Sequence, residues 1–247
     1  MENENIYDKI QELFGGVSGN YSILEEQIDI DLQMEYFDFS KKMERDFTAE
    51  EILDKRENLF DEDTPDTDKK ILFVQLASLE NVDAYRVIER FVNNPVGTLR
   101  DWAVLALQES RMLLESKLLD ENQVFISTGL GGKDNKLRYF LVLMKKDGGE
   151  FSDLQKKIVR NEFDEVLRKN EAEIEELKFN NGFGTITAVI PLNVSIKDLF
   201  KTSIGECNQY GNFLKSNFIV TNVKRLSLNE IKEFIDKNNP ALNEPEN

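Results

Sequence analysis

The sequence predicts an α+β protein with a helical N-terminal part and a mixed C-terminal part. The evidence is a change in hydrophobic periodicity. Apolar residues recur every three or four positions up to Ser116, and at every second position in several later segments. With 247 residues, of which 40% are hydrophobic, the chain can bury a sizeable core in one large or two small domains. We expect a helical domain over residues 1–118, an α+β domain over 119–238 and a flexible tail over 239–247.

The helix predicted from Pro95 to Ser116 organises the N-terminal part. Its apolar residues share one helical face, and they are Leu99, Trp102, Ala103, Ala106, Leu107, Leu113 and Leu114. Thr98 is the expected N-cap residue of this helix. Two more helices are predicted before it, over residues 68–79 and 82–93, and their short connections make successive helices antiparallel neighbours.

This segment resembles a HEAT-type helical repeat. The matching pattern is Leu99-Arg100-x-x-Ala103-Val104-x-Ala106-Leu107, which comes after a first helix and an Asn94-Pro95 turn. The resemblance covers about one repeat, from Val82 to roughly Glu115, whereas a solenoid needs about three repeats to be stable alone. It implies a stack of HEAT-like helical hairpins, and an unrelated helical bundle is the alternative.

The segments before these helices give weaker signals. A short helix is predicted over residues 5–14. Residues 21–38 fit either a strand or a helix, and the helices on their C-terminal side favour the helix. Thr48 and Glu51 form a capping box, so a helix should begin there and run to about Phe60. Thr64 and Pro65 have the order of an N-cap and a first helical residue.

The C-terminal part has the alternation of a sheet with helices. Strands are predicted over residues 123–127, 137–145, 174–179, 185–190 and 213–223, and helices over 152–170, 195–204 and 227–238. From residue 137 this order is β-α-β-β-α-β with a C-terminal helix, the split βαβ, ferredoxin-like arrangement. Its first and third strands are the most apolar and should be central. The extra strand over 123–127 has no place beside the first strand, so either it pairs elsewhere or the sheet order differs.

Charge is unevenly distributed along the chain. The net charge is −16, and residues 1–68 hold 21 acidic and 6 basic residues, a net charge of −15. Such a field repels phosphate backbones and attracts basic partners. The candidate partner-binding residues are Asp61, Glu62, Asp63, Asp66 and Asp68. A solvated, solubilising face is the simpler interpretation. The cluster fails as a calcium loop, because it lacks a liganding residue at the fifth position, glycine at the sixth and glutamate at the twelfth. No metal site is predicted.

The absence of histidine excludes several chemistries. Without it there is no histidine general acid or base, no Ser-His-Asp or Cys-His nucleophile, and none of the usual zinc sites. Cys207 is the one cysteine, so an internal disulfide is excluded and the thiol is expected in the core. Because no signal peptide and no apolar run of about 20 residues is present, we expect a cytoplasmic location.

A glycine-rich loop comes after the strand over residues 123–127. Its candidate anion-binding residues are Gly129, Gly131, Gly132 and Lys133. The loop fails as a Walker A motif, because Asp134 stands where Ser or Thr should bind magnesium and Ser127 stands in place of the first glycine. A flexible hairpin loop is the simpler interpretation.

Residues 181–188 resemble the RNP1 motif of RNA-recognition domains. The sequence there is Asn-Gly-Phe-Gly-Thr-Ile-Thr-Ala, on an expected strand of the predicted fold. However, Thr185 and Ala188 replace two of the aromatic rings that stack on bases, and Asn181 replaces the leading basic residue. Together with the negative charge, this predicts no nucleic-acid partner.

These observations favour a non-enzymatic cytoplasmic protein-binding or regulatory module that presents an acidic N-terminal surface, with self-association also compatible. The alternative is a small-molecule binding protein or carboxylate-dependent enzyme with a site between the two domains. No catalytic residue, cofactor or membrane partner is identified from the sequence.

Overall fold

The structure, a computed structural model, describes residues 21–43, 46–121, 123–180 and 182–238. The predicted helix over 5–14 and the tail over 239–247 lie outside these residues. The chain divides into a helical unit, which ends at Ser127, and an α+β unit, which begins at Thr128. This division lies a few residues after the expected boundary at residue 118.

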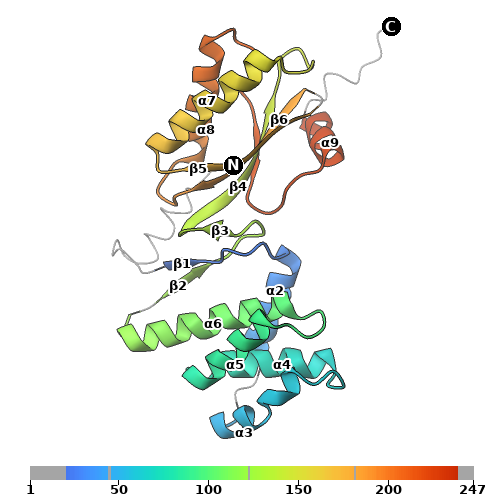
Figure 1. Ribbon diagram of the computed structural model, residues 1–247, viewed down its shortest axis with the longest axis vertical. Coiled ribbons are helices and arrows are strands. Elements are labelled where there is room, and N and C mark those ends of the chain that lie inside the picture. The colour runs from blue at the N-terminus through green and yellow to red at the C-terminus, as the bar shows by residue number, and fades with distance from the viewer. Residues whose placement is uncertain (1–20, 44–45, 122, 181, 239–247) are drawn as a thin grey trace. The chain divides into compact units, whose positions relative to one another are not determined.

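The helical unit has the elements β1 (Tyr21–Ile23), α2 (Ile30–Lys42), α3 (Ala49–Asp54), the 3-10 helix η1 (Arg56–Leu59), α4 (Asp66–Ala77), α5 (Val82–Asn93), α6 (Arg100–Leu119) and β2 (Val124–Ile126). Figure 1 shows α4, α5 and α6 side by side, and α6 also contacts α2. Strand β2 pairs with β1 in parallel. The extra strand therefore pairs elsewhere, and the ambiguous segment 21–38 begins as a strand and becomes a helix at Ile30.

Trp102 lies at the centre of the helical core, as predicted. Its ring is 1% exposed and makes edge contacts with the rings of Tyr36 and Phe39, with centroids 5.1 and 5.7 Å away. Its indole N–H donates to the carbonyl oxygen of Lys70 at 3.3 Å. This hydrogen bond satisfies the one polar group of a buried ring, so the tryptophan links α2, α4 and α6.

Local signals located some helix starts correctly and missed others by a residue or two. The capping box of Thr48 and Glu51 is present at α3. Helix α6, in contrast, begins after Leu99 without a side-chain cap, because the hydroxyl of Thr98 donates to Asp66 at 3.3 Å instead. The expected N-cap at Thr98 is therefore wrong. Pro65, not Thr64, is the N-cap residue of α4.

The α+β unit has the elements β3 (Gly132–Lys133), β4 (Lys136–Met144), α7 (Asp153–Lys169), β5 (Glu173–Asn180), β6 (Phe183–Ile190), α8 (Ile196–Gln209), β7 (Ile219–Thr221) and α9 (Leu228–Asn238). The sheet is antiparallel in the order β5-β6-β4, with β3 and β7 both pairing the other side of β4. The expected central position of the first and third strands is confirmed, and the class is α+β. Strand β7 is shorter than the predicted segment 213–223.

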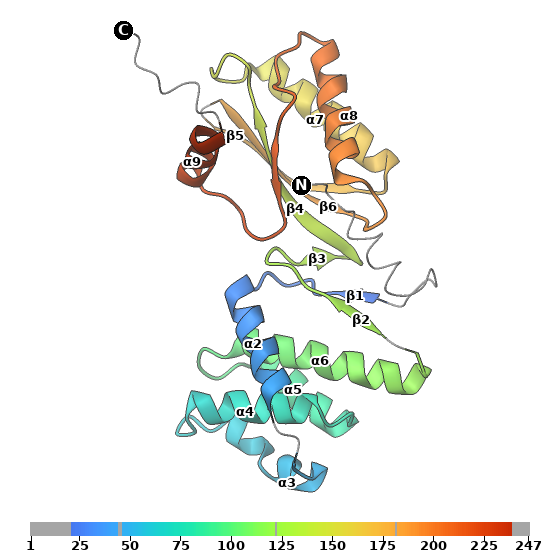
Figure 2. The same cartoon turned by 180° about the vertical axis from the view of Figure 1, so that it is seen from behind.

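Helices cover both faces of this sheet. α7 and α8 pack on one face, where Leu141, Ile186, Phe163 and Phe200 are buried together. α9 packs on the opposite face (Figure 2), against Phe140, Val142 and Ile219. Cys207 is buried in the first core, as expected, and burial raises the pKa of its thiol to about 12. The thiol is therefore protonated at neutral pH and a poor nucleophile.

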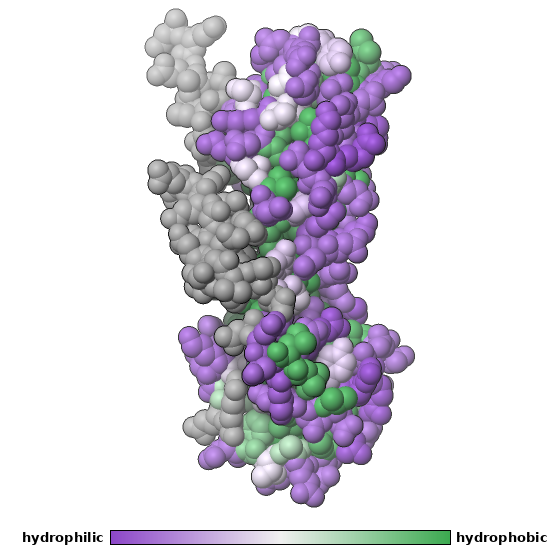
Figure 3. All heavy atoms as spheres, turned by 90° about the vertical axis from the view of Figure 1, so that its left-hand side faces the viewer, coloured by the Kyte–Doolittle hydropathy of each residue, from purple (hydrophilic) through white to green (hydrophobic). Residues whose placement is uncertain are grey.

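No described helix is long and apolar enough to cross a membrane. On the face drawn in Figure 3, hydrophilic residues predominate and hydrophobic ones form small separate patches among them.

Gly129 is required by a close approach within the α+β unit. A β-carbon at this position would overlap the backbone carbonyl of Val223, which cannot rotate away. We therefore expect Gly129→Ala to lower the free energy of unfolding by about 1–3 kcal/mol. Gly205, inside α8 with nothing near its absent β-carbon, is the matched control. Gly205→Ala should raise stability by roughly 0.5–1 kcal/mol, because glycine costs entropy in a helix. Equal denaturation midpoints for the two variants would contradict this account.

Carboxylates along β5 pair with basic side chains. Glu175 accepts from Arg138 Nη2 at 2.8 Å, Glu176 contacts Arg225 at 2.9 Å, and Glu173 contacts Lys133 at 3.4 Å. Strand β5 forms the edge of the described sheet, and charged side chains there disfavour pairing with another strand.

The pair of Arg138 and Glu175 should make stability depend on pH. The hydrogen bond from Arg138 lowers the pKa of Glu175. A depressed pKa stabilises the fold above the unfolded value, about 4.3, and this contribution is lost as the pH falls further. Glu175→Gln should thus unfold more easily than the wild type at pH 7, with the gap closing below about pH 4. Glu173→Gln, which alters a more exposed pair, is the control and should show a smaller gap. Urea titrations across pH measure both.

Candidate functional site

Three arginines of the helical unit converge on one surface hollow, which we call the arginine pocket. The hollow has a volume of about 430 Å³. It is lined by Leu53, Arg56, Glu57, Asp83, Arg86, Val87 and Arg90. These residues come from α3, η1 and α5, so the pocket joins segments that are distant in the sequence.

The fold of residues 48–60 places Arg56 opposite α5. Helix α3 is only six residues long, and Ile52 is its buried residue. The 3-10 turn of η1 then buries Leu59, and the ring of Phe60 packs against Phe91 of α5, with centroids 5.8 Å apart. These apolar contacts hold the outward-facing Arg56 beside α5.

Helix α5 presents the other two arginines. Asn81 caps its N-terminus, and Ala84, Ile88 and Phe91 are its buried residues. Arg86 and Arg90 are four residues apart, so they lie one above the other on the exposed face. Their position results from the same periodicity that buries the apolar face.

Glu57 is shared by two of the arginines. Its carboxylate oxygens accept from Arg90 Nη2 at 2.9 and 3.0 Å, and Arg56 Nε lies 3.7 Å from it. The guanidinium of Arg90 also lies over the ring of Phe60, 3.7 Å from its centroid. Such a cation–π contact contributes roughly 0.5–2 kcal/mol. Arg56 Nη1 donates to the carbonyl of Leu53 at 2.9 Å. The side chains of Arg56 and Arg90 are therefore both held by contacts within the unit.

Arg86 is the third arginine, and its partners lie on α5 itself. It donates to Glu89 at 2.6 Å, and this bond raises the pKa of Arg86, so it stays charged. Its guanidinium lies 5.8 Å from the ring of Tyr85, whose hydroxyl accepts from Arg111 of α6 at 3.1 Å. The side chains of Arg56, Arg86 and Arg90 are 48%, 67% and 49% exposed, so a ligand can reach them.

The pocket is a positive site within an acidic unit. Residues 8–127 contain 27 acidic and 13 basic residues, a net charge of −14. The site itself combines four arginines, counting Arg111, with three carboxylates, which gives +1. The carboxylates are Glu57, Asp83 and Glu89.

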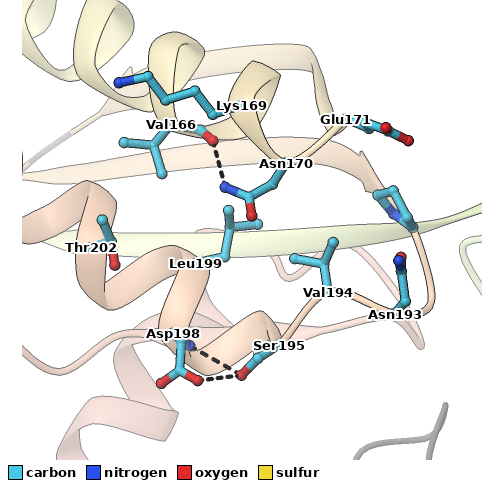
Figure 4. Close-up of a pocket in the computed structure, with 11 residues that line it drawn as sticks. Val166, Lys169, Asn170, Glu171, Asn193, Val194, Ser195, Asp198, Leu199 and Thr202 are labelled. Carbon is cyan, nitrogen blue, oxygen red and sulfur yellow. Dashed lines mark hydrogen bonds between the residues drawn. The ribbon is translucent and has the colours of Figure 1, made fainter.

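A second hollow lies in the α+β unit, between the end of α7 and the start of α8 (Figure 4). Its volume is about 420 Å³. Its polar groups already serve the helix ends. Asn170 Nδ2 donates to the carbonyl of Val166 at 2.9 Å, and the hydroxyl of Ser195 donates to Asp198 at 2.8 Å. Its charged residues are one cation, Lys169, and two carboxylates, Glu171 and Asp198, whereas three cations line the arginine pocket. We therefore favour the arginine pocket as the functional site.

The glycine loop predicted to bind an anion lies in the α+β unit. Residues Thr128–Gly132 are buried, and the N–H groups of Leu130 and Gly131 donate to the carbonyls of Asn222 and Thr128, both at 3.0 Å. Asp134 and Asn135 have positive φ values of 48° and 61° and form the turn of the β3–β4 hairpin. Lys133 pairs with Glu173. An anion-binding role for Gly129, Gly131, Gly132 and Lys133 stays a prediction.

The acidic residues predicted to bind a partner surround the start of α4. Asp61, Glu62, Asp63, Asp66 and Asp68 are all exposed. Asp61 accepts from the N–H of Asp63 at 3.0 Å and from the hydroxyl of Thr64 at 3.3 Å. Across the described residues, no group of three or more Cys, Asp or Glu is placed to hold a metal ion. The binding role of these five carboxylates stays a prediction.

The arginine pocket was not predicted from the sequence. The one local signal is the spacing of Arg86 and Arg90, four residues apart on a predicted helix. Arg56 lies far from them in the sequence, and tertiary contacts such as the packing of Phe60 on Phe91 bring it close.

Comparison with protein families and with characterised proteins gives no match to this chain. The solved structures that resemble part of it include the following two. One is a candidate transposase from Deinococcus radiodurans R1, with 16% identity and a TM-score of 0.37, over 41% of this chain and 90% of that one. The other is a REP-associated tyrosine transposase bound to a REP hairpin, with 10% identity and a TM-score of 0.32, over 44% of this chain and 70% of that one.

These structural neighbours correct the functional predictions. They are transposases and not protein-binding or regulatory repeat proteins, and one of them is bound to a REP hairpin. The prediction of a protein-binding module, its small-molecule alternative and the exclusion of nucleic acid are therefore wrong. With TM-scores below 0.5, the likeness assigns no activity to this chain. The HEAT-like resemblance of residues 82–115 is untested and stays a prediction.

Proposed function

We propose that the helical unit binds the phosphate groups of a single-stranded nucleic acid in the arginine pocket. The observation that carries the proposal is the convergence of Arg56, Arg86 and Arg90 on one hollow. A guanidinium presents a planar fork of N–H donors that matches two phosphate oxygens at once. Three such groups around one hollow can contact a phosphate from several directions.

The surroundings of the pocket favour a single strand over a duplex. A long duplex would bring many phosphates against the surface of this unit, whose net charge is −14. At physiological salt, charges within about 8 Å of one another still interact, so these phosphates would be repelled. A flexible strand can enter the hollow and avoid that surface. Its bases can also stack on guanidinium planes, which Arg86 and Arg90 present on the exposed face of α5.

Fluorescence anisotropy with a labelled single-stranded DNA tests the proposal. Each phosphate that the protein neutralises on a single strand contributes about −0.7 to the slope of log K against log salt, so one phosphate held in the pocket predicts a slope of about −0.7. A duplex of the same sequence should bind more weakly. Absence of binding at low salt, or a preference for the duplex, would contradict the proposal.

We also propose two points that the sequence suggested. The single cysteine, buried as a thiol, is compatible with a reducing compartment and supports a cytoplasmic location. The hairpin of α5 and α6 supports a HEAT-like interpretation of residues 82–115, because these antiparallel neighbours are joined by the expected Asn94-Pro95 turn.

A further inference from the structure

Glu57 occupies the position in the arginine pocket that an anionic ligand would take. Both of its carboxylate oxygens lie within 3.0 Å of Arg90 Nη2, and Arg56 Nε lies 3.7 Å from one of them. Its side chain is 64% exposed and belongs to a short 3-10 turn. A ligand must therefore compete with a carboxylate that can move out to solvent.

This competition distinguishes two kinds of phosphate. An internal phosphodiester carries one negative charge, as Glu57 does, so exchanging one for the other changes little. A terminal phosphate monoester carries about −1.5 to −2 at pH 7 and has three strong acceptor oxygens. It can accept from Arg56, Arg86 and Arg90 together, whereas Glu57 accepts its hydrogen bonds from Arg90.

We infer that the arginine pocket recognises the terminal phosphate monoester of a nucleic-acid strand, and that Glu57 sets this preference by competing with internal phosphates. The inference rests on the proposed function. The lining of the pocket supports an end over an internal position. Arg56, Arg86 and Arg90 line one hollow of about 430 Å³. A monoester has the higher negative charge, so it gains more from three guanidiniums at one place than a phosphodiester does.

The test compares two strands of one sequence, with a 5′-phosphate or a 5′-hydroxyl, against the wild type, Glu57→Gln and Glu26→Gln. Glu26 pairs with Arg100 at 2.7 Å in the same unit and provides the matched control. The wild type and Glu26→Gln should bind the phosphorylated strand about tenfold more tightly, the effect of one additional hydrogen bond to a charged group. Glu57→Gln should bind the hydroxyl strand more tightly than the wild type does. The ratio of its affinities for the phosphorylated and the hydroxyl strand should therefore be smaller than in the wild type.

Each outcome decides a separate point. Equal affinity of the wild type for both strands would overturn the inference and leave the proposed nucleic-acid binding intact. If neither strand binds, both the inference and the proposed function are contradicted. An unchanged ratio in Glu57→Gln would overturn the role of Glu57. Inorganic phosphate, added as a competitor, should displace the phosphorylated strand only at far higher concentration. If it displaces the strand at an equal concentration, the pocket recognises free phosphate and not a strand end.

Discussion

Replacing Arg86 and Arg90 together with alanine should weaken the binding of single-stranded DNA by about a hundredfold or more. These residues supply two of the three guanidinium groups of the arginine pocket. A hydrogen bond to a charged group contributes roughly 1.5–3 kcal/mol, and each 1.4 kcal/mol is a factor of ten in affinity. Anisotropy titrations at low salt, where the wild type binds most tightly, measure the change.

Arg100→Ala is the control for this double variant, compared per positive charge removed, since the double variant removes two charges and the control one. Arg100 lies at the start of α6 in the same unit, and its partner is Glu26. It removes one positive charge from the same acidic unit without touching the pocket. Affinity should stay within about twofold of the wild type, because a distant exposed charge is largely screened. Comparable losses in the two proteins would show that binding depends on overall charge and not on the pocket.

Trp102→Ala should produce the largest loss of stability, about 3–5 kcal/mol in the free energy of unfolding. The indole is 1% exposed and contacts Tyr36 and Phe39 from α2, so its removal leaves a cavity where α2, α4 and α6 meet. The carbonyl of Lys70 also loses its indole donor. Chemical denaturation of the full chain, followed by far-UV circular dichroism, gives the value.

Leu118→Ala on the same helix provides the comparison. Leu118 is 78% exposed near the end of α6, and exposed substitutions of this kind usually change stability by less than about 0.5 kcal/mol. If Trp102→Ala cost less than about 1 kcal/mol, the tryptophan could not be the centre of this core.

Hydrophobic periodicity and capping residues predicted most of the helices. The capping boxes of Thr48, Ser152 and Ser227 each bond the residue three positions on, and such signals act within one turn of chain. Thr98 is not a cap because its hydroxyl donates a hydrogen bond to Asp66, which is distant in the sequence. Tertiary partners of this kind are invisible to a local pattern.

Long-range pairing explains the remaining differences. The extra strand at Val124 has its partner at Tyr21, more than a hundred residues earlier, so no turn signal joins them. The arginine pocket has the same origin, since Arg56 and Arg90 meet through the packing of Phe60 on Phe91. Net charge also misled the prediction. A total of −16 describes the field far from the surface, whereas a compact phosphate at contact distance meets the guanidiniums first.

The central claim is that a phosphate group binds between these arginines. Arginine side-chain N–H resonances, assigned by NMR and followed during titration with a 5′-phosphorylated single strand, test it directly. The signals of Arg56, Arg86 and Arg90 should shift together and saturate at one equivalent, while that of Arg100 stays in place. Shifts confined to arginines of the α+β unit, such as Arg138 or Arg160, would contradict the account.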